Sequence, residues 1–292
     1  MNINTISFDF IKKQAEKKQS NIRIILVCPD DSLLNAAELA KKNNIAQFIV
    51  IDTKKNKLRD TIIAENYEEV MRKVASLILK GEADTMAKGL INTSIFLKEI
   101  IHSKISNQLL THTSIVELKD SKKIFIISDG TVIPNPTLEQ KVTIIENSIK
   151  CANIMGIETP KIALLSANEL ILRGIESGYD CAILSKMAER GQINKKKIVL
   201  DGPMSLDTAV SEEAANNKKL SFAFKPPADI LITPNLENGA FLIKAAVYMG
   251  GAKVAGLLWG ASYPIILTSR ADSEEAKYIS ICLCSLAKSK IQ

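Results

Sequence analysis

Aromatic residues, histidines and metal-binding cysteine patterns are scarce or absent in this sequence. Aromatic residues make up only 5% of the 292 residues, which predicts a core built from aliphatic side chains. The two histidines lie far from the five cysteines, and no two cysteines form a CxxC pair, so we expect no metal site. An odd number of cysteines in a chain of this size indicates reduced thiols, as in the cytoplasm.

Long apolar runs are also absent. No run approaches the ~20 residues that a membrane-spanning helix needs, and the N-terminal residues lack the apolar stretch of a signal peptide. The net charge of +6 is mildly basic and diffuse, and no aromatic platform accompanies the short lysine clusters. We therefore expect a cytoplasmic protein with an anionic small molecule as its ligand and no membrane or nucleic-acid partner.

Two nucleotide-binding motifs are missing as well. No GxGxxG follows a predicted strand, and the spacing GxxxxGK[ST] does not occur. A dinucleotide-binding Rossmann site and a P-loop therefore have no support.

The sequence does contain an alternation of short apolar runs and amphipathic segments. Residues 22–28 and 46–51 are apolar runs typical of strands, whereas residues 33–43 have apolar side chains at helical spacing. The same rhythm continues along the chain, with a break at Pro134 and Pro136 that we interpret as the crossover to a second domain. It predicts an α/β fold with mainly parallel sheets covered by helices.

One stretch, residues 264–275, combines a strand end with a helix start. Residues 265–267 form an apolar run, and an acidic pair then opens a predicted helix that ends near residue 288, with Asp272 or Ser273 as its N-cap. Free backbone N–H groups at such a helix start bind anions, and the guanidinium of Arg270 matches phosphate geometry. The alternative is a capped surface helix in which Arg270 pairs with a carboxylate.

Lys88 and Gly89 end another predicted short strand. Thr93 is the expected N-cap of a helix over residues 94–103. A cation beside a glycine at a strand end suits a phosphate or thioester ligand, and an exposed lysine before a turn is the alternative. His112 lies on a predicted strand, where a single histidine is more often structural than catalytic.

Four acidic or amide residues follow later predicted strands. They are Asp201, Asp207, Asn235 and Glu237. We expect residues 235–239 to form a loop before a helix over residues 240–249. In open α/β sheets ligands bind at the edge where strands end, so these residues are candidates for substrate binding.

In their order along the chain, these motifs resemble the phosphate acetyl/butyryl transferase family, and its butyryl branch most closely. Each motif is weak alone, but the ordered set is specific, and it extends from about Ala87 to the C-terminus. The matching motifs are Lys88-Gly89 with Thr93, Thr111-His112, residues 136–141, residues 161–169, Asp201-Gly202-Pro203 with Leu206-Asp207, residues 228–231, Pro234-Asn235 with Glu237, Gly239 and Lys244, and residues 268–273.

This resemblance implies an acyltransferase that moves a short-chain acyl group, butyryl in the most similar branch, between coenzyme A and inorganic phosphate. These substrates need no further cofactor, and the family forms homodimers or higher homo-oligomers. The resemblance also implies two α/β domains with an inter-domain cleft, as in isocitrate and isopropylmalate dehydrogenases. Because the C-terminal stretch returns to the first domain in this fold, we expect domains of residues 1–134 with 262–292 and of residues 135–261.

The resemblance also assigns site residues. The family's serine–arginine pair, which holds phosphate, falls on Ser269 and Arg270, and we expect both to be catalytic together with Asp272. The residues expected to bind substrate are Lys88, Gly89, Thr93, His112, Asp201, Asp207, Asn235, Glu237, Gly239 and Lys244.

The sequence departs from the family pattern at several points. The turn after Asp129 is Gly130-Thr131 instead of alanine-rich, and residues 223–227 replace a valine-alanine-glycine turn. Ala240 replaces an asparagine. Ala276 stands where the acetyl branch has a catalytic aspartate that the butyryl branch generally lacks, and either Asp272 or Glu275 could substitute for it.

Two other hypotheses are open. The chain could be a catalytically weak paralogue that binds coenzyme A or acyl phosphate as a sensor or partner protein, which the changes at Ala240 and residues 225–227 favour. It could also be a dehydrogenase of the isopropylmalate type, but that enzyme needs a carboxylate cluster for a divalent metal and a nucleotide site. Neither can be assembled from this sequence.

Overall fold

Two compact units make up the chain in a computed structural model, which describes residues 6–54, 60–194 and 198–291. The terminal unit contains residues 6–110 and the C-terminal stretch from residue 254. The central unit contains residues 111–253. The domain boundaries expected at residues 134 and 262, and the cleft between domains, stay predictions.

The terminal unit is built on a mainly parallel sheet. Its strands follow the order β3-β2-β1-β4-β11-β10, in which only the β10–β11 pair is antiparallel among the pairs recorded for these strands. The bounds are β1 Ile22–Val27, β2 Ala46–Asp52, β3 Thr61–Ile63, β4 Thr85–Lys88, β10 Lys253–Ala261 and β11 Ile265–Ile266.

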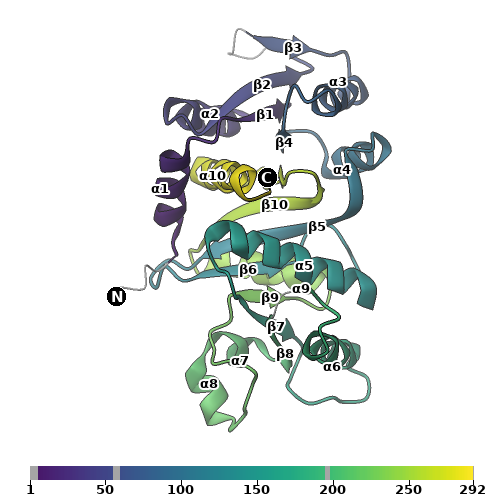
Figure 1. The fold of residues 1–292 in the computed structure, drawn as a ribbon, viewed down its shortest axis with the longest axis vertical. Coiled ribbons are helices and arrows are strands. Elements are labelled where there is room, and N and C mark those ends of the chain that lie inside the picture. The colour runs from purple at the N-terminus through teal and green to yellow at the C-terminus, as the bar shows by residue number, and fades with distance from the viewer. Residues whose placement is uncertain (1–5, 55–59, 195–197, 292) are drawn as a thin grey trace. The chain divides into compact units, whose positions relative to one another are not determined.

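Helices cover both faces of the terminal unit's sheet. Figure 1 shows α1, α2 and α10 on one side and α3 and α4 on the other. Their bounds are α1 Phe8–Lys18, α2 Asp31–Lys42, α3 Tyr67–Leu79, α4 Thr93–His102 and α10 Glu274–Ile291. Helix α10 packs against both α1 and α2, and it is apolar on most sides because it is enclosed by them and by the sheet.

The central unit has the same kind of architecture. Its strands follow the order β5-β6-β9-β7-β8, and the pairs are parallel except for the antiparallel β5–β6. The strands are β5 Ser106–Glu117, which begins in the terminal unit, β6 Ile124–Ser128, β7 Lys161–Leu165, β8 Val199–Met204 and β9 Ile230–Ile232. The helices are α5 Leu138–Met155, α6 Glu176–Glu189, α7 Leu206–Val210, α8 Glu212–Asn217, α9 Leu236–Lys244 and the π-helix η1 Ala245–Met249.

These elements confirm the predicted mixed α/β class with mainly parallel pairing. All five cysteines are free thiols buried in the core, as expected for reduced cysteines. Most of the other core side chains are aliphatic, as the low aromatic content predicts. No helix among the described residues is long and apolar enough to cross a membrane. Thr137 and Gln140 have capping-box spacing in the sequence, and they form a capping box at the start of α5.

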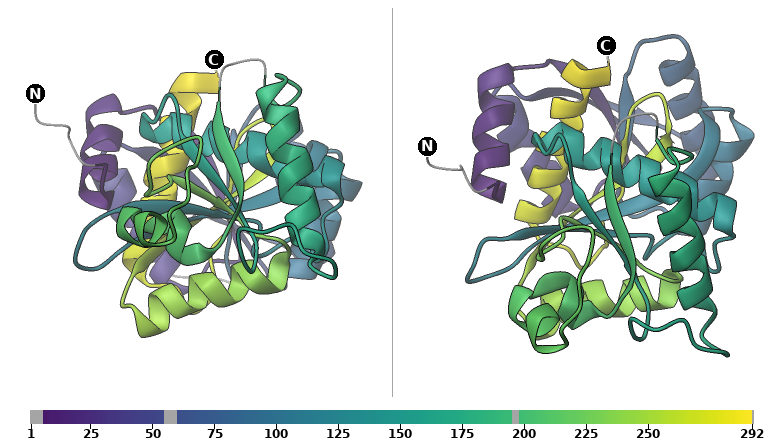
Figure 2. Two further views of the ribbon diagram at one scale, coloured as in Figure 1. Left: turned by 90° about the horizontal axis from the view of Figure 1, so that it is seen from below. Right: turned by 60° about the horizontal axis from the view of Figure 1, so that its bottom comes forward.

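Two local predictions were wrong. Residues 235–239 are not a loop, because Asn235 caps a helix that already begins at Leu236 and runs on into η1, and the two form one continuous yellow-green helix in Figure 2. Thr93 is not the N-cap of α4. Asn92 takes that place, since its side-chain oxygen accepts hydrogen bonds from both the backbone N–H and the hydroxyl of Ser94.

Candidate functional site

The carboxyl ends of β1, β4 and β11 meet at one edge of the terminal unit's sheet. Val27 is paired with Lys88, and Ile266 is paired with Ala87, so the segments that follow these strands emerge side by side. Lys88 is the last residue of β4, and the segments after β1 and β11 carry Asp30 and Arg270. This edge is where parallel α/β sheets bind ligands.

Lys88 is a buried cation at this edge, with only 4% of its surface exposed. Its ammonium donates a 3.2 Å hydrogen bond to the carbonyl of Gly89, and among the described residues no carboxylate lies within ion-pair distance of it. Burial lowers the pKa of Lys88, the charges of Arg270 and Lys277 lower it further, and Asp30 opposes them. A buried charge without a counter-ion is costly, so this position favours a bound anion.

Gly89 allows the backbone after β4 to lie directly against the end of β1. A Cβ at this position would lie 2.1 Å from the carbonyl oxygen of Cys28, so no other residue fits without a shift of the backbone. Leu90 N–H donates to the same carbonyl at 2.7 Å. The close contact holds Lys88 at the edge and accounts for the Lys88-Gly89 pair of the sequence.

Arg270 lies exposed in the turn between β11 and α10. Its guanidinium donates a 2.9 Å hydrogen bond to the carbonyl of Leu90, and no described carboxylate pairs with it. The expected alternative, an arginine paired with a carboxylate on a surface helix, is therefore wrong. Arg270 instead spans from the β11 turn to the β4 turn, next to Lys88.

Ser269 and Asp272 shape the same turn. The Asp272 carboxylate accepts a 2.6 Å hydrogen bond from Ser269 N–H, and the Ser269 hydroxyl accepts one from Ala271 N–H. Ser273, rather than Asp272, caps α10, since its hydroxyl accepts from Ala276 N–H at 3.2 Å. The structure thus brings Lys88, Gly89, Ser269, Arg270 and Asp272 together in one unit.

A second lysine, which sequence reasoning missed, lies behind this cluster. Lys277 on α10 has a side chain that is 3% exposed and forms an ion pair with Asp30 at 2.7 Å. Asp30 also caps α2 through Leu33 N–H. No local motif marks Lys277 in the sequence, and its neighbours Ala276 and Tyr278 are buried with it in the structure.

In the central unit, His112 is held by backbone hydrogen bonds. Its N–H donates to the Asp129 carboxylate at 3.0 Å, and its carbonyl accepts from the Ser128 hydroxyl at 2.7 Å. The other Asp129 oxygen accepts from Thr131 and Val132 N–H groups. Burial raises the pKa of Asp129, and the nearby His112 charge opposes that rise. Through these backbone contacts the two residues stabilise the turn after β6, and substrate binding by the His112 side chain stays a prediction.

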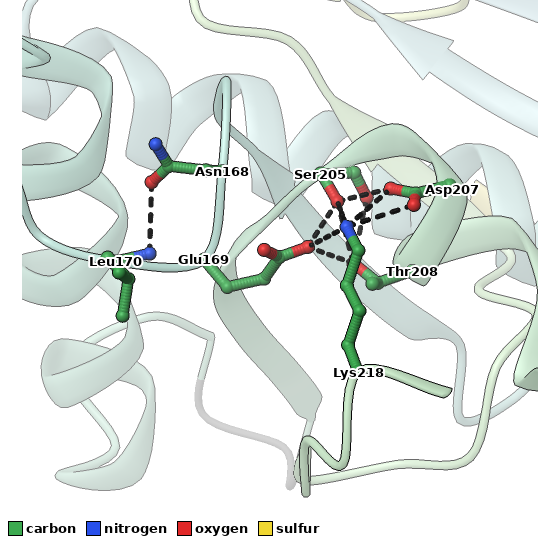
Figure 3. A network of polar contacts seen from close by, with 7 residues as sticks. All are labelled: Asn168, Glu169, Leu170, Ser205, Asp207, Thr208 and Lys218. Carbon is green, nitrogen blue, oxygen red and sulfur yellow. Dashed lines mark hydrogen bonds and ion pairs between the residues drawn. The ribbon is translucent and has the colours of Figure 1, made fainter. Parts of the chain in front are cut away.

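Asp207 belongs to a network of polar side chains near the end of β8 (Figure 3). The Ser205 hydroxyl contacts the carboxylates of Glu169 and Asp207, and Lys218 forms ion pairs with both at 3.0 and 2.9 Å. Burial would raise the pKa of Glu169, but hydrogen bonds from Ser205, Lys218 and Thr208 outweigh it and lower that pKa to about 2. Hydrogen bonds from Ser205 and Lys218 lower the pKa of Asp207 to about 2 as well.

The other expected residues of the central unit do not gather at one point. The Asp201 carboxylate accepts from Gly202 and Ala223 N–H groups, which gives it a local structural role. Glu237 and Lys244 are exposed on α9. Gly239 is buried against the turn after Asp129.

Asn235 borders a cavity of about 540 Å³ within the central unit. The cavity lies among residues of α5, α6, α9 and the loop after β7. Lys141 and Asp180 form a 2.6 Å ion pair in its wall, with Lys141 almost fully buried. Among the described residues there is no group of three or more histidine, cysteine, aspartate or glutamate side chains that could hold a metal ion.

The family model for phosphate acetyl/butaryl transferases matches residues 53–284 of this chain. The chain belongs to the phosphate acetyl/butyryl transferase family. It is therefore a phosphate acyltransferase, an enzyme whose substrates are acyl-coenzyme A and phosphate and whose products are an acyl phosphate and coenzyme A.

Named relatives support this membership over nearly the whole chain. The chain is 34% identical to a phosphate butyryltransferase of Clostridium acetobutylicum over 96% of this chain and 97% of the relative. It is 41% identical to a phosphate acetyltransferase of Thermotoga maritima over 75% of each. A crystal structure of a branched-chain phosphotransacylase from Enterococcus faecalis V583 is similar with a TM-score of 0.82 and 31% identity, covering 91% of this chain and 99% of that chain.

Proposed function

We propose that this enzyme is a phosphate butyryltransferase that converts butyryl-coenzyme A and phosphate into butyryl phosphate and coenzyme A. The observation that carries the proposal is the buried Lys88 beside Arg270, two cations at a strand edge with no described carboxylate paired to either. Such a pair suits a multiply charged oxyanion. The butyryl preference is supported by Ala276 at the position of the acetyl branch's catalytic aspartate, and by a similar phosphate butyryltransferase that matches almost the full length.

The chemistry requires a phosphate oxygen to attack the thioester carbonyl. A C–O bond forms, the C–S bond breaks, and the proton of hydrogen phosphate goes to the leaving thiolate. In this proposal Arg270 and Lys88 hold phosphate, and Ser269 with nearby backbone N–H groups donates to the developing negative charge. All five cysteines are buried, and burial raises the pKa of Cys28 and Cys151 to about 12, so direct transfer to phosphate is favoured over an acyl-cysteine intermediate.

The remaining expected residues stay part of this proposal as contacts for acyl-coenzyme A. Asn235 has the best support, because it borders the cavity of about 540 Å³. Asp272 is the expected base or orienting group, and its hydrogen bond to Ser269 N–H fits the second of these roles. We also propose that the protein forms a homodimer or higher homo-oligomer, which sedimentation velocity tests directly.

A thiol-release assay with purified protein tests the proposed function. Coenzyme A release from butyryl-coenzyme A should require phosphate or arsenate, should be faster than release from acetyl-coenzyme A, and should persist in EDTA. Equal release without an oxyanion would exclude acyl transfer to phosphate, and a preference for acetyl-coenzyme A would exclude the butyryl assignment. Tight binding of coenzyme A without turnover would favour the sensor hypothesis.

A further inference from the structure

Asp30 is held by three groups that stabilise its negative charge. The ammonium of Lys277 contacts both carboxylate oxygens, at 2.7 and 2.9 Å, while the Ser32 hydroxyl and Leu33 N–H donate at 2.9 and 2.8 Å. Burial would raise the pKa of Asp30, but hydrogen bonds led by that of Lys277 outweigh it and lower the pKa. Asp30 is therefore ionised, and both of its carboxylate oxygens accept hydrogen bonds.

Lys88 lies near this carboxylate without pairing to it. Asp30 follows β1 by three residues, and Lys88 is paired with the last residue of that strand, so both lie at the same sheet edge. The charge of Asp30 acts on Lys88, yet no ion pair between them forms. Two buried lysines, Lys88 and Lys277, thus lie near the carboxylate of Asp30, and only Lys277 forms an ion pair with it.

We propose that Lys277 is a positioning residue for phosphate binding: by engaging Asp30 it keeps that carboxylate from pairing with Lys88, so the Lys88 ammonium stays available for substrate phosphate. The inference rests on the proposed function. It also explains why the buried Lys88 has no carboxylate partner among the described residues, although the carboxylate of Asp30 lies at the same sheet edge. Without Lys277, Asp30 would be a partly buried carboxylate, 21% exposed and without an ion-pair partner, that is attracted to Lys88, and phosphate would have to displace it.

A purely structural role is the competing explanation. Lys277 and Asp30 join α10 to the start of α2, two helices that pack against each other. If the role is only structural, loss of the Lys277–Asp30 ion pair lowers the stability of the protein. Replacing both residues would then not restore KM for phosphate. The two explanations therefore differ in what the Asp30→Asn change does to a Lys277→Met protein.

The experiment compares steady-state constants for phosphate in wild type, Lys277→Met, Asp30→Asn and the double variant. Lys277→Met should raise KM for phosphate by about tenfold or more with a smaller fall in kcat, because a charge-assisted contact to phosphate is lost. Asparagine caps helices as well as aspartate does and cannot pair with Lys88, so Asp30→Asn should leave KM unchanged or lower. The double variant should return KM to within about threefold of wild type.

A matched control lies at the other end of the same helix. Lys288 forms a 3.1 Å ion pair with Asp84, which also keeps a 3.0 Å pair with Arg23. Lys288→Met removes a partly buried α10 ion pair far along the helix from Arg270, and KM for phosphate should not change. A rise in KM equal to that of Lys277→Met would mean that any weakening of α10 has this effect, and would overturn the proposal.

Phosphate binding by calorimetry, without acyl-coenzyme A, separates this inference from the proposed function. If wild type binds phosphate but transfers no acyl group, the proposed function fails, while weaker binding by Lys277→Met that is restored in the double variant still supports the inference. Normal phosphate binding by Lys277→Met, or no restoration in the double variant, overturns it. If Lys277→Met does not fold, a raised KM in Asp30→Asn overturns it and an unchanged or lower KM supports it.

Discussion

Gly130 and Gly239 pack backbone against backbone in the central unit. A Cβ added to Gly239 would lie 2.7 Å from the Cα of Gly130, and one added to Gly130 would lie 2.8 Å from the carbonyl carbon of Gly239. Because neither neighbour is a flexible side chain, Gly239→Ala should destabilise the protein by ~1–3 kcal/mol as an overpacked contact. Urea unfolding followed by circular dichroism measures this change.

Gly178 provides the control for that substitution. It also lies in a helix, α6, but a Cβ added there would have its nearest neighbouring atom 3.6 Å away, which is ordinary van der Waals contact. Gly178→Ala should therefore stabilise the protein by ~0.5–1 kcal/mol through helix propensity. Equal effects of the two substitutions would show that the Gly130–Gly239 contact does not determine the outcome.

Arg270 is the second test. Arg270→Ala should lower kcat/KM for phosphate by ~10²–10³ through loss of a preorganised donor, with a smaller effect on KM for acyl-coenzyme A. Arg270→Lys should not restore activity, because lysine keeps the charge but loses the planar fork of donors. The side chain is exposed, so circular dichroism should show both variants folded. Near wild-type turnover in folded Arg270→Ala would remove Arg270 from the site.

Local patterns accounted for much of the fold. The capping box of Thr137 and Gln140 is a short-range signal, and α5 begins where it predicts. The apolar runs of the parallel strands were recognised for the same reason. In contrast, Gly239 indicates a loop on local grounds, and only its contact with Gly130, more than a hundred residues earlier, explains a glycine inside α9.

The candidate site could be predicted only in part from the sequence, because local signals mark some of its residues while their contacts depend on long-range packing. Lys88 was recognised at the end of a strand and Arg270 in the turn that follows one. The hydrogen bond from Arg270 to the carbonyl of Leu90, two residues after Lys88, depends on the β4–β11 pairing. The Lys277–Asp30 pair spans 247 positions, and neither residue carries a motif. Such a pair becomes visible only when α2 and α10 pack together.

The Glu169–Lys218–Asp207 network predicts a pH dependence of stability. Both carboxyl groups have a folded-state pKa of about 2, below their ordinary values of 4.5 and 3.8, so their contribution is fully present above those values and is lost as pH falls toward about 2. Lys218→Met should therefore lower stability most at neutral pH, and the difference from wild type should shrink on acidification. Urea unfolding at several pH values measures it. A difference that stays constant from pH 7 to pH 3 would contradict the assignment.

Lys88 gives a pH dependence of the same sign at alkaline pH, although for Lys88 the charged form is the one that the folded protein disfavours. Burial, Arg270 and Lys277 lower its pKa below the ordinary 10.5, against the pull of Asp30, so the unfolded chain binds the proton more tightly than the folded protein does. Stability should therefore rise with pH between the lowered value and 10.5, and Lys88→Met should be more stable than wild type at neutral pH because it removes a buried charge without a counter-ion.

The same titration should limit phosphate binding. As Lys88 loses its proton, KM for phosphate should rise on the alkaline side in wild type, whereas Lys88→Met should have a high KM that depends little on pH in this range. Lys88→Arg keeps a permanent charge, so its alkaline rise should be smaller than that of wild type whatever its KM at neutral pH. These profiles come from initial rates at saturating acyl-coenzyme A. An alkaline rise of the same size and midpoint in Lys88→Met would assign the titration to another group and remove Lys88 from phosphate binding.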